Sequence, residues 1–224
     1  MIKLVAFDWN GTLLADTYTV YKAAQDAYKF LGIENLTFGK FRETFTVPIA
    51  DFYEANGVNK NFVLENTQKV ADLFHTNYEP LAQKVRTRAH SKTVLQWLKE
   101  NKIPAIIISN HIKESIDIHL KRLKIEDHFN KVIGNYKFGA AIKARNKKER
   151  LHNYLLKKGI NPQEVLIVGD SIEEVEIAKE LGTISAAITH GNCSTPRLKA
   201  AKPDYLISDL GNLINIIREI NNET

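Results

Sequence analysis

The sequence predicts an α/β fold in which a doubly wound, mainly parallel sheet carries an inserted all-helical domain. Short apolar segments rich in β-branched residues alternate with amphipathic segments of helical period along most of the 224 residues. This alternation is typical of a parallel sheet with helices on both faces. Only the stretch between the first two apolar segments lacks a strand-like pattern. Polar residues directly follow three of the predicted strands, which places them at one edge of the sheet.

The first predicted strand covers residues 4–7 and ends abruptly in the sequence Asp8-Trp9-Asn10-Gly11-Thr12. Its apolar residues suit a strand that is buried on both faces. A carboxylate that follows such a strand lies at the carboxyl edge of the sheet, where open α/β sheets bind their ligands. The same residues also suit an ordinary turn, so this segment alone leaves both interpretations open.

Residues 15–87 predict the inserted helical domain, because apolar side chains recur there at helical spacing and no strand-like segment interrupts them. Pro48 suits a first helical turn, and Gly32 and Gly57 suit helix ends. The remaining residues, 1–14 and 88–224, form the predicted sheet domain. The helices predicted in the insert cover residues 18–31, 38–45, 48–55 and 61–85.

Strands and helices alternate from residue 92 onward. The predicted strands are apolar segments at residues 104–108, 131–133, 164–168, 184–188 and 205–207. The predicted helices cover residues 92–101, 113–123, 147–158, 173–181 and 210–220. Gly159 and Gly182 follow two of these helices at the position of a C-terminal cap.

The composition is that of an ordinary globular protein, with 44% hydrophobic and 25% charged residues. No apolar segment approaches the ~20 residues of a membrane span, so we expect no membrane partner. The single Cys193 excludes an internal disulfide, and the N-terminus has no signal-peptide pattern; we therefore expect a cytoplasmic protein. The net charge of +5 is not accompanied by basic segments interleaved with aromatic residues, so we expect no nucleic-acid partner.

Two further strand ends carry polar residues. Ser109-Asn110 follows the second predicted strand, and Gly169-Asp170 follows a later one, with Lys147 at the start of the helix between them. In a doubly wound sheet these strand ends can converge with Asp8 on one crevice. An aspartate can act as a nucleophile on phosphorus. Phosphoryl transfer depends mainly on positioning and on charge neutralisation, which a lysine, a hydroxyl and Mg²⁺ held by carboxylates can provide.

In combination, these segments resemble the motifs of the haloacid dehalogenase (HAD) superfamily, in the phosphoglycolate-phosphatase-like branch that has a helical cap. The motifs are DWNGTL at residues 8–13, the strand that ends in Ser109-Asn110, Lys147 before a helix, and GDSIEE at residues 169–174. Each is weak alone, but their order and the size of the insert extend the resemblance over nearly the whole chain. It implies a HAD-type, Rossmann-like core and Mg²⁺-dependent hydrolysis of a small phosphorylated metabolite through an aspartyl-phosphate.

The resemblance also implies roles in catalysis and metal binding. Asp8 corresponds to the nucleophile and first Mg²⁺ ligand, and Asn10 corresponds to the position whose backbone carbonyl also binds the metal. Asp170 corresponds to a metal-binding carboxylate. Glu174 takes the place of a second acidic residue of the metal site, which is usually Asp in the family.

A second set of positions resembles the substrate-binding residues of the family. In the family, the hydroxyl at the position of Ser109 holds the phosphoryl oxygens, and the lysine at that of Lys147 neutralises the nucleophile and the phosphate. Lys143 and Lys148 are alternatives for this lysine, but the spacing to Asp170 favours Lys147. The predicted substrate-binding residues are Thr12, Ser109, Asn110 and Lys147.

Asn10 departs from the family pattern. Phosphatases of this family usually carry Asp two residues after the nucleophile, where it protonates the leaving oxygen and then activates water. An amide cannot exchange protons near neutral pH, and general acid–base catalysis contributes about 10²–10⁴-fold. Turnover is then slow, or the leaving group needs no proton, or another residue substitutes. His111, His190 and Asp16 are the candidates, although Asp16 also suits the start of a helix.

Two other branches of the superfamily and a weakly catalytic role are alternatives. Haloacid dehalogenases need no metal, but Asp170 followed by Glu174 favours a Mg²⁺ site. Phosphonoacetaldehyde hydrolases have a similar D-W-x-G-T motif and need a lysine in the cap loop; residues 46–50 contain none, although Lys40 and Lys60 lie nearby. The third alternative is a regulatory protein that binds phosphate or keeps a long-lived aspartyl-phosphate.

Substrate choice should depend on the cap loop at residues 45–53, which would face the crevice. The nearby Arg42 could bind an anionic group, although plain helix packing explains the same residues. As partners we expect a small phosphorylated metabolite and, for the chain itself, a monomer or a homodimer.

Overall fold

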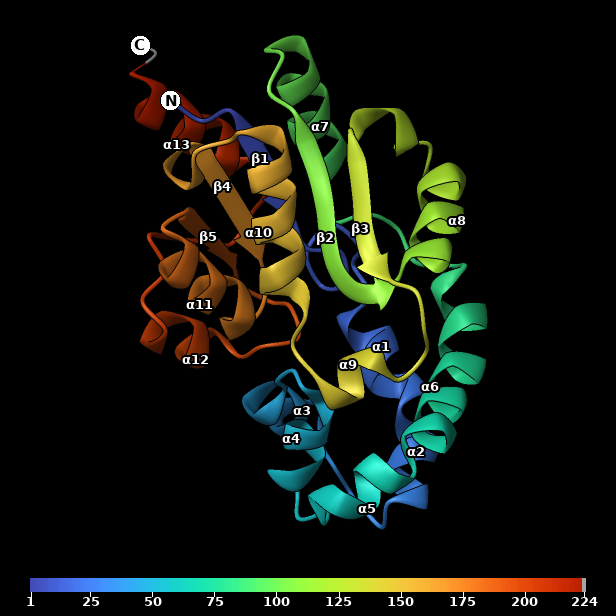
Figure 1. Cartoon of the computed structure of the whole chain (residues 1–224). Coiled ribbons are helices and arrows are strands. Elements are labelled where there is room, and N and C mark those ends of the chain that lie inside the picture. The colour runs from blue at the N-terminus through green and yellow to red at the C-terminus, as the bar shows by residue number, and fades with distance from the viewer. Residues whose placement is uncertain (223–224) are drawn as a thin grey trace.

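A six-stranded parallel sheet forms the centre of the computed structural model, which describes residues 1–222 (Figure 1). The strand order is β3-β2-β1-β4-β5-β6, and each neighbouring pair of these strands is parallel. The chain extends the sheet first on one side of β1 and then on the other, as in a doubly wound sheet. The predicted fold class is confirmed. The strands are β1 (Leu4–Phe7), β2 (Ala105–Ile112), β3 (Lys131–Asn135), β4 (Val165–Gly169), β5 (Ile184–Ile188) and β6 (Tyr205–Ile207).

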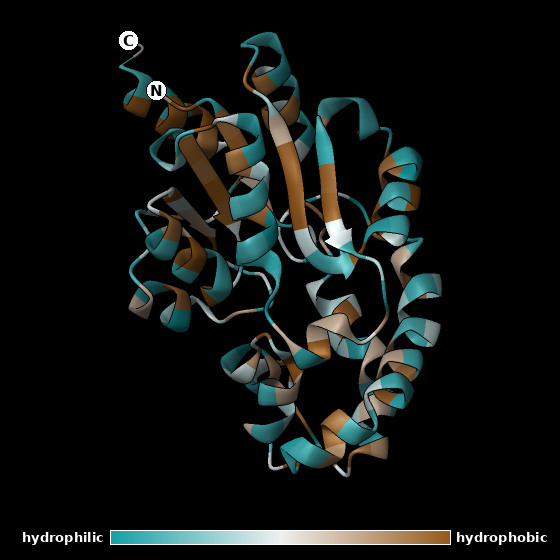
Figure 2. Ribbon diagram, viewed as in Figure 1, coloured by the Kyte–Doolittle hydropathy of each residue, from teal (hydrophilic) through white to brown (hydrophobic). Residues whose placement is uncertain are grey.

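Helices cover both faces of the sheet. They are α7 (Ser91–Glu100), α8 (Lys113–Leu123), α10 (Lys147–Lys158), α11 (Ile172–Leu181), α12 (Thr195–Ala200) and α13 (Asn212–Asn221), with 3-10 turns at Glu126–His128 and Pro162–Glu164. In β1, Val5 and Phe7 pack toward α7, α8 and α13, whereas Leu4 and Ala6 pack toward α10 and α11. Each large apolar side chain buried in this way contributes about 1.5–3 kcal/mol. Figure 2 shows apolar strands enclosed by helices that are polar on their outer surfaces.

The helices between β1 and β2 form a second lobe with an apolar cluster of its own (Figure 1). They are α1 (Thr17–Ala23), α2 (Gln25–Phe30), α3 (Phe38–Thr44), α4 (Ile49–Glu54), α5 (Lys60–Glu65) and α6 (Thr67–Ala82). Aromatic side chains such as Tyr28, Phe41 and Phe52 dominate this cluster. Helix α9 (Ala140–Lys143) follows β3 in the chain but adds Ile142 to the same cluster.

Two of the predicted helices are interrupted in the structure. Residues 18–31 lie in α1 and α2 with a break at Ala24, and residues 61–85 lie in α5 and α6 with a break at Asn66. The side chain of Asn66 donates to the carbonyl of Phe62 and so satisfies the last turn of α5. Such local hydrogen bonds compete with helix continuation, and apolar periodicity does not reveal them.

Strand β2 extends beyond the predicted strand at residues 104–108. It continues to Ile112, and its register with β3 shifts between Ile108 and Ile112. A bulge of this kind redirects side chains next to a site. Ser109 and Asn110 therefore lie within the strand instead of in the loop after it. Two short helices, α9 and α12, were also not predicted from the sequence.

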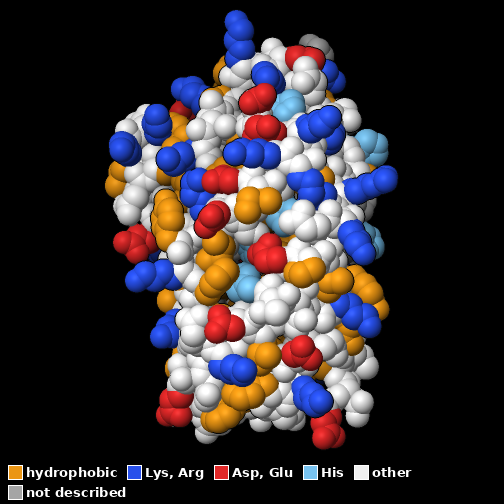
Figure 3. Space-filling model, turned by 90° about the vertical axis from the view of Figure 1, so that its right-hand side faces the viewer, with side chains coloured by type: hydrophobic (Ala, Val, Ile, Leu, Met, Phe, Trp, Pro, Cys, Tyr) orange, Lys and Arg blue, Asp and Glu red, His pale blue; other side chains and the backbone are white. Residues whose placement is uncertain are grey.

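The surface over α6 and α8 carries acidic, basic and apolar side chains interspersed with one another (Figure 3). Among residues 1–222, none of the helices combines the length and the apolar character that a bilayer crossing requires.

Candidate active site

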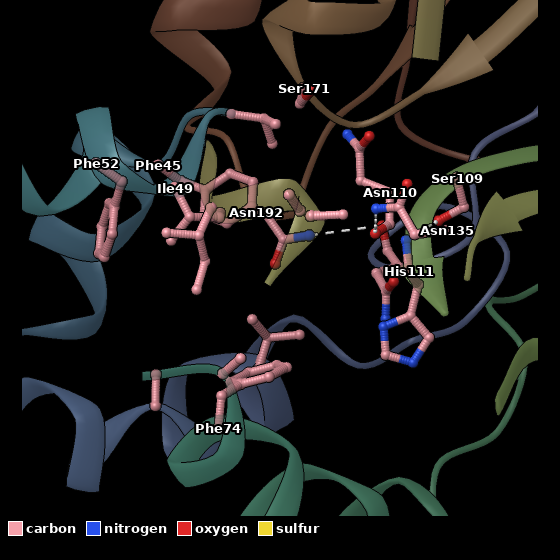
Figure 4. Close-up of a pocket in the computed structure, with 18 of the residues that line it drawn as sticks. Phe45, Ile49, Phe52, Phe74, Ser109, Asn110, His111, Asn135, Ser171 and Asn192 are labelled. Carbon is pink, nitrogen blue, oxygen red and sulfur yellow. Dashed lines mark hydrogen bonds between the residues drawn. The ribbon is translucent and has the colours of Figure 1, made fainter. Parts of the chain in front are cut away.

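Most of the predicted site residues lie in one cavity, between the carboxyl edge of the sheet and the helical lobe. Asp8 directly follows β1, and Asp170 directly follows the neighbouring strand β4. The strand order reverses at this pair of strands, which is where open α/β sheets bind ligands. Figure 4 shows Ser109 and Asn110 on the sheet side of this cavity. The predicted residues that line it are Asp8, Asn10, Ser109, Asn110, Lys147, Asp170 and Glu174.

Lys147, the first residue of α10, places a buried ammonium group among carboxylates. Its Nζ lies 2.9 Å from Oδ1 of Asp8 and 3.6 Å from Oε2 of Glu173, and it also contacts Oε1 of Glu174. Burial by itself lowers the pKa of Lys147, but these carboxylates outweigh it and raise the pKa well above its usual value. Lys147 therefore stays protonated at neutral pH and connects β1 with α10 and α11.

The site holds more negative than positive charge. Four carboxylates are buried there, those of Asp8, Asp170, Glu173 and Glu174, and Lys147 is the only described cation in ion-pair contact with any of them. Burial raises the pKa of Asp8 well above its usual value; Lys147 lowers it, and Glu174 and Asp170 raise it further. Burial and Glu174 raise the pKa of Asp170 to about 7. A further positive charge would therefore stabilise the ionised cluster.

The oxygen atoms at this position suit a divalent cation such as Mg²⁺. Asp8 and Asp170 offer carboxylate oxygens and Asn10 offers a backbone carbonyl, and Mg²⁺ prefers hard oxygen ligands. Oε1 of Glu173 and Oδ1 of Asn192 are buried without a hydrogen-bond partner in residues 1–222, as expected beside a ligand site. In the same part of the chain, no three His, Cys, Asp or Glu side chains are gathered as a metal-binding group. Two carboxylates and a carbonyl would thus hold the ion, together with water and substrate, and the predicted contact of Glu174 with the metal stays a prediction.

Asp16, one of the candidates for the missing acid, is fully buried beside Asn10. Nδ2 of Asn10 and the hydroxyl of Tyr78 each donate to Oδ2 of Asp16 at 2.6 Å. The backbone N–H of Gly11 donates to Oδ1 at 2.7 Å. The Asp16 side chain makes no capping hydrogen bond to α1 and does not line the cavity. Burial raises the pKa of Asp16, but Asp16 accepts all three hydrogen bonds, so the amide nitrogen of Asn10 points toward it and the amide oxygen points away.

The predicted substrate-binding residues differ in how they are held. Oγ of Ser109 accepts a hydrogen bond from the backbone N–H of His111 at 3.1 Å, so its own proton is available to a ligand. Nδ2 of Asn110 donates to Oε2 of Glu173 at 2.6 Å. Thr12 does not line the cavity; its hydroxyl donates to Oδ1 of Asp170 at 3.1 Å. The predicted contact of Thr12 with substrate stays a prediction.

The two histidines considered as substitutes for the missing acid lie in different places. His111 belongs to β2 and lines the cavity, with its Nε2 3.1 Å from Oγ of Ser115. Burial and the nearby His75 lower the pKa of His111 to about 3, so its ring is neutral at pH 7. His190 is exposed in the loop after β5 and does not line the cavity.

Comparisons with known proteins agree with this geometry. The sequence model of the haloacid dehalogenase-like hydrolases matches residues 5–188, which include every predicted site residue. The chain belongs to the haloacid dehalogenase-like hydrolase family. A phosphoglycolate phosphatase of Vibrio vulnificus (strain YJ016) is 25% identical over 224 residues, and the match covers 96% of each chain. A pyrophosphatase PpaX of Oceanobacillus iheyensis is 24% identical, with 96% of this chain and 97% of that protein covered.

Solved structures of low sequence identity share the fold of this haloacid dehalogenase-like hydrolase. A structure described as that of a "predicted phosphatase" from Clostridium acetobutylicum has a TM-score of 0.82 at 17% identity and covers 98% of this chain and 99% of its own. A haloacid dehalogenase-like hydrolase from Streptococcus pneumoniae has a TM-score of 0.77 at 20% identity and covers 96% of this chain and 98% of its own. The shared coverage includes both the sheet and the helical lobe.

Two site residues of this haloacid dehalogenase-like hydrolase were not identified from the sequence. Glu173 contacts both Lys147 and Asn110, and its position next to Glu174 in the GDSIEE motif is the available signal. Asn192, in the loop after β5, donates its backbone N–H to Oδ2 of Asp170; no sequence pattern marks it.

Gly11 has a steric reason to be glycine in this motif. Its φ is +71°, and a Cβ atom would lie 2.2 Å from Oδ2 of Asp170. Any larger residue would displace that carboxylate. The glycine of the DWNGT segment therefore allows the β1 turn to approach the end of β4.

Asn10→Asp should destabilise the protein, because it replaces a donor by a second carboxylate in contact with Asp16. We expect the free energy of unfolding to fall by about 2–4 kcal/mol. Adding Asp16→Asn makes residue 16 the donor and residue 10 the acceptor, and it should recover most of the lost free energy of unfolding. Urea unfolding of the four proteins at about pH 7.5 gives the coupling energy as a double-mutant cycle. Asp127→Asn, at an exposed position, is the control. If the changes in the free energy of unfolding caused by Asn10→Asp and Asp16→Asn were simply additive, the contact between the two residues would be contradicted.

Acidification should destabilise the protein through His111. The unfolded state takes up a proton near pH 6.5, whereas the folded state resists protonation until about pH 3, so stability is full above pH 6.5 and falls as the pH drops. Between about pH 6.5 and 5, wild type should lose about 2 kcal/mol more than His111→Gln. Chemical unfolding across this range measures the difference. Exposed His152→Gln should behave as wild type; equal slopes for wild type and His111→Gln would refute the assignment.

Proposed function

We propose that this protein is a phosphatase that hydrolyses a small phosphomonoester through an aspartyl-phosphate on Asp8, with Mg²⁺ as its cofactor. The observation that carries the proposal is the environment of Asp8, which lines the cavity at the end of β1 with Oδ1 held 2.9 Å from the ammonium group of Lys147. The names of the relatives, phosphoglycolate phosphatase and pyrophosphatase, support phosphoryl transfer as the class of reaction.

The contacts of Asp8 suit nucleophilic attack. Lys147 holds Oδ1, and Oδ2 accepts no hydrogen bond from the described residues. Oδ2 forms a bond to phosphorus while the bond between phosphorus and the leaving oxygen breaks, and the leaving group departs as an oxyanion that takes a proton from water. Water then attacks the phosphorus of the aspartyl-phosphate, which releases phosphate and restores Asp8.

The residues around Asp8 would orient the phosphoryl group. The hydroxyl of Ser109 would donate to a phosphoryl oxygen, and Lys147 would balance negative charge on the opposite side. Bound by Asp8, Asp170 and the carbonyl of Asn10, Mg²⁺ would neutralise charge on the phosphoryl oxygens. Glu174 contacts both Lys147 and Ser171, and we propose that it holds this lysine in place behind the metal.

The leaving group receives no proton from Asn10. The amide nitrogen of Asn10 is engaged by Asp16, and the ring of His111 is neutral. The site therefore favours leaving groups that depart without prior protonation. The same contact supports a second candidate function: a slow enzyme in which the aspartyl-phosphate persists and serves as a regulatory signal.

We further propose that the helical lobe, residues 15–87, acts as the cap of this site. Its aromatic residues Phe45, Phe52 and Phe74 line the same cavity as Asp8. Neither Lys40 nor Lys60 lines the cavity, so the lobe offers no lysine for a Schiff base. This supports a phosphatase over a phosphonoacetaldehyde hydrolase.

Asp8→Asn should abolish turnover, because the amide cannot attack phosphorus. We expect hydrolysis of p-nitrophenyl phosphate, with Mg²⁺ present, to fall by about 10³-fold or more. Nitrophenolate departs without a proton, so this substrate does not depend on the missing acid. Asp127→Asn on the surface is the matched control. Retention of more than about a tenth of the wild-type rate would exclude Asp8 as the nucleophile.

Removal of divalent cations should abolish the same activity, and Mg²⁺ should restore it. Mg²⁺ should also raise the melting temperature, because it neutralises the carboxylate cluster; at 100 times its Kd we expect a shift of about 5 °C or more. Asp170→Asn should lose most of this shift. Differential scanning fluorimetry with and without EDTA measures it, and an unchanged shift in Asp170→Asn would place the ion elsewhere.

A further inference from the structure

The cavity at the proposed active site has two chemically different sides. Its floor, at the edge of the sheet, carries the polar and charged residues described above. Its roof, formed by the helical lobe and α9, is apolar and largely aromatic. Figure 4 shows Phe45, Ile49 and Phe74 on the roof side, across the cavity from Ser109 and His111. If the phosphoryl group binds at the floor, the rest of the substrate lies against this roof.

The two arginines near the roof are engaged within the protein and do not line the cavity. Arg42 lies close by, but it donates to the carbonyls of Gly191 at 2.8 Å and Cys193 at 3.2 Å. Arg145 is engaged by the carbonyl of Val47 and the carboxylate of Glu176. Two neighbouring arginines thus serve the packing of the loops, and the predicted contact of Arg42 with an anionic group finds no support.

The other basic residues of the lining are also committed or exposed. Lys147 contacts three carboxylates on the floor. Lys137 is exposed, in the loop before α9. His75 on α6 has Nδ1 3.6 Å from the carboxylate of Glu79. Lys137 is thus the remaining cation of the lining; away from it, a carboxylate or second phosphate of a substrate would lose its hydration against the apolar roof without gaining a partner.

Two polar atoms of the roof have no hydrogen-bond partner within residues 1–222, the hydroxyl of Tyr28 and Nδ1 of His75. The side chain of Tyr28 lines the cavity and is 3% exposed, and its hydroxyl makes no hydrogen bond within residues 1–222. Buried hydroxyl groups in proteins are usually paired. Burial raises the pKa of Tyr28 above its usual value, so the group is neutral and can donate or accept one hydrogen bond. Tyr28 therefore gives the roof an uncharged hydrogen-bonding group in apolar surroundings.

We propose that the substrate is the phosphomonoester of a largely apolar phenol, or of another compound with an acidic hydroxyl group, that carries no second charge and has an uncharged hydrogen-bonding group that reaches Tyr28. The proposal rests on the phosphatase function proposed above and specifies its substrate class. It differs from the names of the relatives, because phosphoglycolate carries a carboxylate and pyrophosphate a second phosphate.

Three aryl phosphates test the proposal, because their leaving groups are of nearly equal acidity. They are phenyl phosphate, 4-(hydroxymethyl)phenyl phosphate and 4-(carboxymethyl)phenyl phosphate. We expect kcat/KM for the carboxymethyl ester, which carries an additional carboxylate, to be at least about 10²-fold lower than for phenyl phosphate. The hydroxymethyl ester should equal or exceed phenyl phosphate, and Tyr28→Phe should remove any such advantage. Equal or better turnover of the charged ester, phosphoglycolate or pyrophosphate would overturn the proposal.

A cation placed in the roof should reverse this preference. Ile49→Lys should raise kcat/KM for the carboxymethyl ester and lower it for phenyl phosphate, which raises the ratio of the two values. Ile118→Lys, at an exposed position of α8, should leave this ratio unchanged. Circular dichroism checks that both variants fold. An unchanged ratio in folded Ile49→Lys would show that the roof does not contact the substrate and would contradict the proposal.

A binding measurement separates this proposal from the phosphatase function. Isothermal titration calorimetry with benzylphosphonate and 4-carboxybenzylphosphonate measures how each compound binds in the cavity, without any turnover. We expect benzylphosphonate, which lacks the carboxylate, to bind at least about tenfold more tightly than 4-carboxybenzylphosphonate. This result is expected even if p-nitrophenyl phosphate is not hydrolysed and the phosphatase function fails. Hydrolysis of p-nitrophenyl phosphate that depends on Asp8, together with equal binding of the two phosphonates, would retain the function and reject the substrate class.

Discussion

A buried ammonium group among four buried carboxylates is the interaction on which the site depends. Lys147 enters from α10 and contacts Asp8 after β1 and two glutamates of α11. Removing one partner from such a cluster leaves an uncompensated buried charge. Because one ammonium cannot balance four carboxylates, the cluster is well suited to receive a divalent cation. The contact that organises the strand ends thus also prepares the site for a metal and a phosphoryl group.

The helical lobe reaches the same site through a second buried carboxylate. Asp16 joins the turn after β1 to Tyr78 of α6 and fixes the amide of Asn10. The residue that departs from the family pattern is therefore part of a satisfied hydrogen-bond network, which the lobe completes. This explains how an amide is accommodated where a carboxylate is usual: a second acidic residue already occupies the space behind it.

The two lobes contribute different chemistry to the cavity. The sheet edge supplies charge, which suits the common step of phosphoryl transfer. The lobe supplies apolar surface and one unpaired hydroxyl, that of Tyr28, which suits recognition of the rest of the substrate. In the function proposed above, the strand ends would carry out the reaction and the helices would select the substrate.

The sequence by itself determined the alternation of strands and helices, the helical insert and the strand-end positions of Asp8 and Asp170, because periodicity and turn residues are local properties. It also placed Lys147 at the start of a helix. Only the tertiary structure decided that Lys147 contacts Asp8 across 139 residues and that Asp16 binds Asn10 instead of capping a helix. The same is true of Arg42 and Arg145, which bind backbone carbonyls and do not line the cavity. These contacts depend on which elements pack together, and no local pattern in the chain records that.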